Sequence, residues 1–200
     1  MESLAGLVMA LGELDRWEAA RREIEKYSRV RQNPRFVNVA RNYVSWRRNE
    51  PLGNEIKITD EFLFYDLQRF WRLEFRWARG AAPGDLLTDV EEELGWTSEE
   101  HRALVQSLRA DLWAAEGRVE EALVLARRAR DQVMTDMKTY PTARAYFDVV
   151  TERCARIARQ TGHAKEAEDA EDEYRRWRQE QKGRSSYWPS GLEPLVRDSP

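Results

Sequence analysis

Hydrophobic residues recur along this chain every three or four positions, and the runs are separated by short polar breaks. Helix-starting residues precede several runs, as in the stretch "GWTSEEHRAL", where Thr97 is an expected N-cap and Glu100 follows three residues later. No comparable pattern marks strands. The sequence therefore predicts an all-α protein, with helices over 2–14, 16–31, 34–48, 59–79, 85–94, 98–116, 118–136, 142–161 and 163–182.

The stretch "AAEGRVEEALVLARRA" shows how these helices are paired. Gly117 interrupts two strongly helical runs, Ala110 precedes it by seven residues and Ala122 follows it by five. Small residues on both sides of a break allow two antiparallel helices to approach closely, so Gly117 marks an elbow between paired helices. The same arrangement recurs with Ala155, Gly162 and Ala167, and more weakly with Asp15 and Ala20.

This repeated elbow resembles the tetratricopeptide (TPR) repeat, a helix–turn–helix unit of about 34 residues. The resemblance extends over four units, although Val8, Asp15 and Ala158 depart from the usual residue types. In the second unit only the first helix fits, because the 49–58 insertion and a long second helix over 59–79 break the register. The matching residues are Leu4, Leu7, Leu11 and Ala20; Phe36, Val39, Ala40 and Tyr43; Ala110, Trp113, Gly117, Ala122, Ala126 and Ala129; and Cys154, Ala155, Gly162 and Ala167.

The resemblance implies a right-handed α-solenoid of about four antiparallel helix pairs with one insertion. It places one repeat domain over 1–182 and a flexible tail over 183–200. The alternative is another α-solenoid or an irregular helical bundle. TPR-like stacks act as adaptors or scaffolds, so the expected partner is a protein or an acidic peptide held in a groove formed largely by the first helices of successive pairs.

The charge balance further restricts the class of binding partner. With 33 basic and 36 acidic residues the net charge is −3, which makes nucleic acid an unlikely partner and gives no general attraction to membranes. No apolar run reaches the roughly 18 residues of a membrane span, and the N-terminus lacks the basic start of a signal peptide. The single cysteine, Cys154, excludes an internal disulfide and is expected inside a helix. These features predict a cytoplasmic protein.

Catalytic chemistry has little support in the sequence. His101 and His163 each fall in a polar first helical turn, where exposure is expected. No HExxH, GxSxG or Walker motif is present, and "RGAAPGD" lacks the Lys-Ser/Thr pair that a phosphate-binding loop requires. The sequence therefore predicts a protein that is not an enzyme and that uses no cofactor or metal.

The segment from Asp60 to Gly80 carries the main candidate site. Apolar residues cover most of its helical circumference, and the remaining face carries a row of arginines that continues for three turns: Arg69, Arg72, Arg76 and Arg79. Arginine rows bind carboxylates bidentately, so this row is a candidate for binding an acidic peptide. In the alternative, Asp66, Glu74 and acids of the 85–94 helix pair with the row as scaffold.

Further candidate contacts lie near the N-terminus. Tyr43 and Trp46 are the aromatic candidates, and Leu7 and Leu11 belong to a first helix that is apolar nearly all round. Three explanations remain open for that helix: a partner or a second copy packs on it, missing N-terminal repeats of a longer protein do, or the second helix pair covers it. The alternative function is a regulatory or effector subunit, or the C-terminal fragment of a larger repeat protein, that controls a partner protease or nuclease.

Overall fold

The computed structural model describes residues 4–13, 15–30, 34–48 and 65–180, and every regular element in these ranges is a helix. The all-α prediction is therefore confirmed for this part of the chain. The elements are α1 (Leu4–Glu13), α2 (Trp17–Val30), α3 (Pro34–Arg48), α4 (Tyr65–Ala78), α5 (Pro83–Trp96), α6 (Glu99–Ala115), α7 (Val119–Thr139), the 3₁₀ helix η1 (Pro141–Tyr146), α8 (Phe147–Gln160) and α9 (Ala164–Glu180).

Where the described residues allow the comparison, the expected helix boundaries agree with the observed ones to within a few residues, with two local differences. The single helix expected over 142–161 is divided into η1 and α8, and the boundary between α5 and α6 is shifted. Thr97 was expected as the N-cap of α6, but α6 begins at Glu99 with Ser98 as its cap residue. Thr97 instead ends α5, because its amide and its hydroxyl both donate to the Glu93 carbonyl, at 2.9 and 2.7 Å. The expected 49–58 insertion and the 183–200 tail lie outside the described residues.

The helices divide into two compact units, α1 to α3 and α4 to α9. In the first unit, α1 packs on α2 and both pack on α3. Gly12 lies where these helices meet, since a Cβ there would stand 2.8 Å from the Trp17 ring and 2.9 Å from the Tyr43 ring. The single repeat domain over 1–182 stays a sequence prediction.

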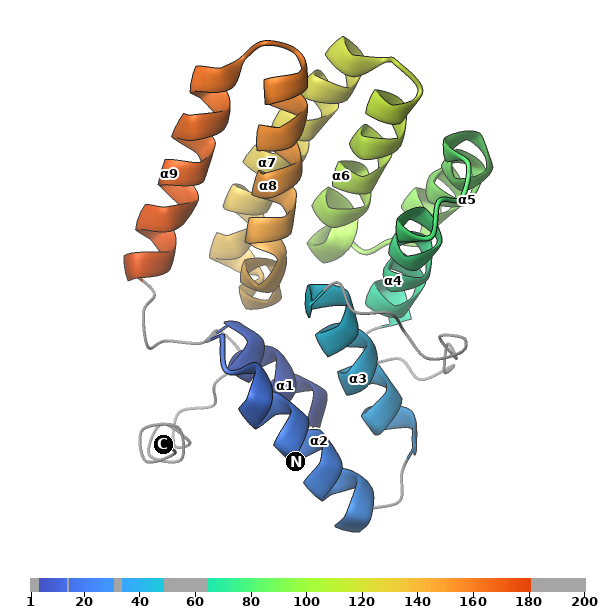
Figure 1. The fold of residues 1–200 in the computed structure, drawn as a ribbon, viewed down its shortest axis with the longest axis vertical. Coiled ribbons are helices and arrows are strands. Elements are labelled where there is room, and N and C mark those ends of the chain that lie inside the picture. Colours follow the sequence, from blue (N-terminus) through green and yellow to red (C-terminus); the bar gives the residue numbers. More distant parts are fainter. Residues whose placement is uncertain (1–3, 14, 31–33, 49–64, 181–200) are drawn as a thin grey trace. The chain divides into compact units, whose positions relative to one another are not determined.

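In the second unit each helix packs on the next one along the chain, with η1 between α7 and α8 (Figure 1). In addition, α4 packs on α6 and α6 on α8, so the first helices of three successive pairs form a row. The sequence pattern treated 59–79 as the second helix of a pair. In the structure α4 is a first helix, paired with α5 through an elbow at Gly80.

Four elbows share one backbone geometry. Gly80, Gly117 and Gly162 have φ values of 81°, 84° and 81°, and Asp15 has the same left-handed sign at 59°. At each elbow this residue donates its amide to the carbonyl three residues back, and the next residue donates to the carbonyl five residues before itself. Those two bonds form the Schellman motif that ends a helix. The elbows predicted at Asp15, Gly117 and Gly162 are thus observed, and Gly80 is a fourth.

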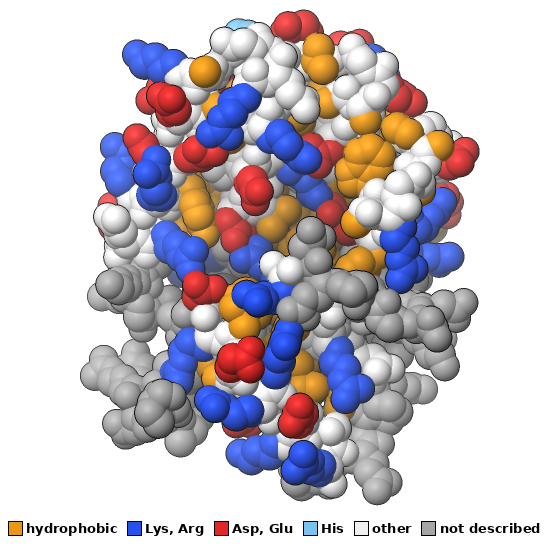
Figure 2. All heavy atoms as spheres, viewed as in Figure 1, with side chains coloured by type: hydrophobic (Ala, Val, Ile, Leu, Met, Phe, Trp, Pro, Cys, Tyr) orange, Lys and Arg blue, Asp and Glu red, His pale blue; other side chains and the backbone are white. Residues whose placement is uncertain are grey.

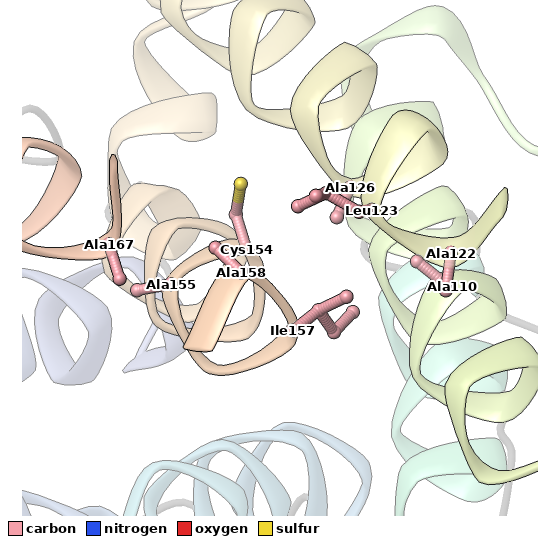
Figure 3. Packing of buried hydrophobic residues seen from close by; sticks show 9 residues of the cluster. All are labelled: Ala110, Ala122, Leu123, Ala126, Cys154, Ala155, Ile157, Ala158 and Ala167. Atoms are coloured by element: carbon pink, nitrogen blue, oxygen red, sulfur yellow. The ribbon is translucent and has the colours of Figure 1, made fainter. Parts of the chain in front are cut away.

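Small residues pack the helix pairs together, as the sequence predicts. Ala122 and Ala167, each five residues after an elbow, are fully buried, and so is Ala20 in the first unit. Cys154 is buried among them, also as expected. Figure 3 shows the cluster between α6, α7, α8 and α9, which consists of Ala110, Ala122, Leu123, Ala126, Cys154, Ala155, Ile157, Ala158 and Ala167.

Candidate functional site

The arginine row of α4 is divided between scaffold contacts and solvent. Arg69 Nε lies 2.5 Å from Glu93 Oε2 of α5, and the Glu93 side chain is buried. Arg76 forms an ion pair with Asp89, also on α5. For these two arginines the structure agrees with the alternative in which acids of the following helix pair with the row.

The other two arginines of the row are exposed. Arg72 makes no ion pair with another described residue, and Arg79 lies just beyond the end of α4 at the Gly80 elbow. Glu74, an expected scaffold partner of the row, instead contacts Arg153 of α8. A role of the row in ligand binding therefore stays a prediction, and Arg72 is the exposed member for which no ion pair with a described residue is found.

The candidate contacts near the N-terminus are largely part of the first unit's interior. Tyr43 is 2% exposed, and its ring lies 6.2 Å from the rings of both Trp17 and Trp46. Leu11 is buried, while Leu7 and Trp46 are half-buried. Leu7 and Trp46 are consequently the members of this group that retain surface for a partner.

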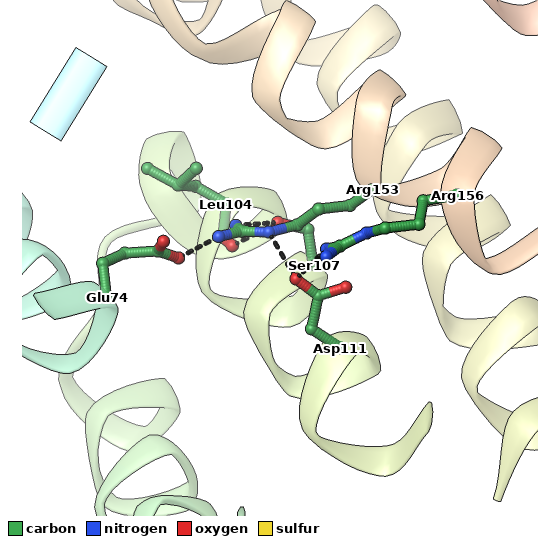
Figure 4. A network of polar contacts seen from close by, with 6 residues as sticks. All are labelled: Glu74, Leu104, Ser107, Asp111, Arg153 and Arg156. Carbon is green, nitrogen blue, oxygen red and sulfur yellow. Dashed lines mark hydrogen bonds and ion pairs between the residues drawn. The ribbon is translucent and has the colours of Figure 1, made fainter. Parts of the chain in front are cut away.

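A polar network along the first helices of the second unit was not anticipated from the sequence. Arg153 of α8 donates from Nε to Asp111 Oδ2 at 2.9 Å and from Nη1 to Ser107 Oγ at 2.9 Å, both on α6. Its Nη2 donates to Glu74 of α4. Figure 4 shows that one guanidinium thus joins three helices that are distant in the sequence.

Burial controls the electrostatics of this network. It raises the pKa of Glu74 above the ordinary carboxyl value, against the opposing effect of Arg153. For Arg153, burial acts to lower the pKa, but the charges of Glu74 and Asp111 outweigh it and hold the pKa above its ordinary value. A buried ion pair tolerates its desolvation cost only when its hydrogen bonds are satisfied, and Arg153 meets this condition by donating through all three nitrogens.

Arg156 is the member of the network that reaches solvent. Its side chain is 53% exposed, and its Nη2 donates to Asp111 Oδ2 at 2.6 Å. No other described residue accepts a hydrogen bond from it. One edge of the guanidinium is therefore held in position by a buried carboxylate, while the rest of the group remains available for another anion.

The positions of these residues follow from the elbows. Glu74, Asp111 and Arg156 each stand six residues before an elbow glycine, so they occupy equivalent sites on α4, α6 and α8. The equivalent position in the first unit is Met9, which is buried and apolar. The sequence shows charged residues six positions before Gly117 and Gly162. Their shared position on the first helices becomes apparent only when α4 is recognised as a first helix too.

The two histidines behave differently from one another. His163 is exposed, as expected, but the prediction that His101 is exposed is wrong, since it is 8% exposed. The Tyr146 ring of η1 packs over it with a ring separation of 5.9 Å, which the polar character of the α6 first turn did not reveal. Within the described ranges no three His, Cys, Asp or Glu residues form a group that could hold a metal ion.

The face of the molecule drawn in Figure 2 has no uniform charge. Figure 2 shows acidic, basic and hydrophobic side chains interspersed on the face it presents. None of the described helices has the length and apolarity needed to cross a membrane.

The chain matches no known protein-family model, no curated protein and no solved structure. Across the described ranges the fold is all-helical, with paired helices and a polar row along the first helices α4, α6 and α8 of the second unit.

Proposed function

We propose that this chain is a non-catalytic protein–protein interaction module, an adaptor or scaffold built from TPR-like helix pairs stacked as a right-handed α-solenoid. Support comes from the helix contacts in the second unit, where second helices α5 and α7 pack on the next first helices and the first helices also pack on one another. The four equivalent elbows support a repeat, because each pair turns through the same hydrogen-bonded motif.

The observation that carries the proposal is the half-exposed guanidinium of Arg156 on the first-helix row. A side chain already oriented by Asp111 loses less conformational freedom on binding than a free surface arginine does. Its unused donors suit a carboxylate, so the partner is a protein segment that presents an acidic side chain or its C-terminal carboxylate. Trp77 and Ala114 follow Glu74 and Asp111 by three residues on their helices, and both are half-buried.

Affinity purification from the source cells with the tagged full chain tests this function. The comparison is between the unmodified chain, Arg156→Glu and a matched control, Arg128→Glu, which reverses an exposed arginine on the second helix α7. We expect a defined set of co-purifying proteins that is lost with Arg156→Glu and retained with Arg128→Glu. If both variants lose the co-purifying proteins, binding depends on overall charge. If both retain them, Arg156 is not the binding site.

A further inference from the structure

Trp96, the last residue of α5, is the most exposed large hydrophobic residue of the described chain, at 74%. The helix register explains its position, because Leu86, Val90 and Glu93 form the buried stripe of α5 and Trp96 lies outside it. An isolated exposed indole is a common centre of binding energy in protein interfaces.

Exposed carboxylates without an ion-pair partner among the described residues stand before and after Trp96 along the chain. Asp85 and Glu92 lie on the same face of α5 as Trp96, and Glu99 begins α6 three residues later. All three are exposed, and none makes an ion pair with another described residue. Arg102, exposed one turn into α6, is the cation near them in sequence. We call Asp85, Glu92, Trp96 and Glu99 the Trp96 surface.

The neighbouring acids of α5 differ from these three. Asp89, Glu91 and Glu93 each have an arginine partner inside the unit, namely Arg76, Arg109 and Arg69. Asp89 stands on the same face of α5 as Trp96, seven residues before it, so Arg76 neutralises one acid of that face. Glu92, one turn before Trp96, has no such partner among the described residues. Uncompensated charge at an exposed aromatic group favours a cationic ligand.

The chain itself shows how its tryptophans are covered when a guanidinium is available. Arg109 and Arg118 lie on the Trp113 ring, with Cζ atoms 4.5 and 4.2 Å from its centroid. Arg47 lies 5.7 Å from the Trp46 ring. No described arginine occupies the equivalent position over Trp96.

From this charge complementarity we propose that the Trp96 surface docks a basic, arginine-containing segment of a partner protein, with a guanidinium stacked on Trp96 and paired with Glu92 or Glu99. This goes beyond the proposed function, because the surface is separate from Arg156 and takes a ligand of opposite charge. Either proposal can therefore fail while the other stands.

A fluorescence-anisotropy titration of the full chain against a short fluorescein-labelled arginine-rich peptide tests the proposal. We expect saturable binding that weakens about tenfold with Trp96→Ala, as loss of a cation–π contact and its burial implies. Trp96→Phe should retain part of the affinity. Replacing Glu92 and Glu99 together with Gln should weaken binding and reduce its dependence on salt.

Matched controls are available on other helices. Val124→Ala removes another exposed apolar side chain, on α7, and replacing Glu168 and Asp169 with their amides removes two exposed acids of α9. Neither change should alter binding, and thermal melts should show that all variants remain folded. The proposal is overturned if binding does not saturate, or if Trp96→Ala binds like the unmodified chain.

Two other occupants give distinct results, and each would also overturn the proposal. Equal affinity for a neutral leucine-rich peptide would make the surface a general apolar contact without a role for charge. Self-association in light scattering that Trp96→Ala abolishes, without peptide binding, would identify a second copy of the chain as the occupant.

Discussion

At the scale of single residues, the elbow glycines are selected by backbone conformation and not by space. Gly117 has φ +84°, and a Cβ built on it meets no atom within 4 Å. A glycine at an elbow has two possible reasons, a special backbone conformation or a close helix approach, and the structure supports the first for Gly117. Asp15 fits the same elbow because Asp and Asn adopt left-handed backbone conformations more readily than most residues.

We therefore predict that Gly117→Val destabilises the protein by about 1–2 kcal/mol, the cost of a left-handed conformation for a residue with a Cβ. Gly117→Asn should cost clearly less, since Asn tolerates this conformation. Urea unfolding followed by circular dichroism measures both. Equal losses for Val and Asn would show that conformation is not the cause.

The thiol of Cys154 is a second residue whose chemistry follows from its surroundings. Burial raises its pKa to about 11. At neutral pH the folded protein then holds very little thiolate, and reaction with a disulfide reagent should require opening of the α7–α8–α9 cluster.

We predict slow labelling of Cys154 in native buffer and fast labelling in denaturant. Because the raised pKa favours the neutral thiol in the fold, this stabilising effect is complete below the unfolded pKa of a thiol and is lost as the pH rises toward 11. Labelling kinetics in native buffer over a pH series measure the reactivity of the Cys154 thiol and check this prediction. Labelling in native buffer at the rate of a free thiol would contradict it.

At the scale of helices, Arg153 is the residue on which the first-helix row depends. Its removal leaves the buried carboxylates Glu74 and Asp111 without their main cation, so Arg153→Met should cost about 3–5 kcal/mol. Arg156→Gln, which removes a half-exposed guanidinium, should cost less than about 1 kcal/mol. Chemical denaturation of both variants gives the comparison.

Two further measurements separate electrostatics from packing in this prediction. Adding Glu74→Gln and Asp111→Asn to Arg153→Met should restore part of the stability, because the stranded charges are removed. The loss in Arg153→Met alone should also shrink as the pH falls, since burial raises the pKa of Glu74 and protonation of this carboxyl removes its stranded charge. A pH-independent loss without rescue would assign the role of Arg153 to packing.

How far the sequence predicts these elements depends on the kind of signal. Gly117 and Gly162 reveal their elbows because an alanine follows each at the same distance. Gly80 was missed because Pro83 begins α5 and Asp85 stands at the alanine position. The pairing of Arg69 and Arg76 with α5 was among the sequence alternatives. The reach of Arg153 to Glu74 was not, because it depends on how α4, α6 and α8 stack.

At the scale of the whole molecule, the question is whether the apolar surface of the N-terminal helix α1 belongs to the internal core or to an interface with another chain. The sequence left open whether a partner, missing repeats or the second pair covers its apolar surface. Val8, Met9 and Leu11 are buried in the structure, and α1 packs on both α2 and α3. These residues agree with the explanation in which neighbouring helices of the same chain cover α1.

We predict that Leu11→Asp destabilises the protein and lowers its helicity, because it places a charge in the interior of the first unit. Leu7→Asp, at a half-buried position, should have a smaller effect. Circular dichroism melts and light scattering measure stability and mass together. A folded Leu11→Asp variant with altered mass would instead place Leu11 in an interface between chains.

The shared elbow geometry also constrains how this chain can change in evolution. Intervals between successive elbows differ along the sequence, so the fold does not require one fixed spacing between elbows. The offset of six positions between Glu74, Asp111 or Arg156 and the elbow glycine that follows it has no such freedom. One residue added or removed there would rotate the charged position by about 100° around its helix and out of the row. Length variation among descendants of this sequence should therefore avoid these three intervals.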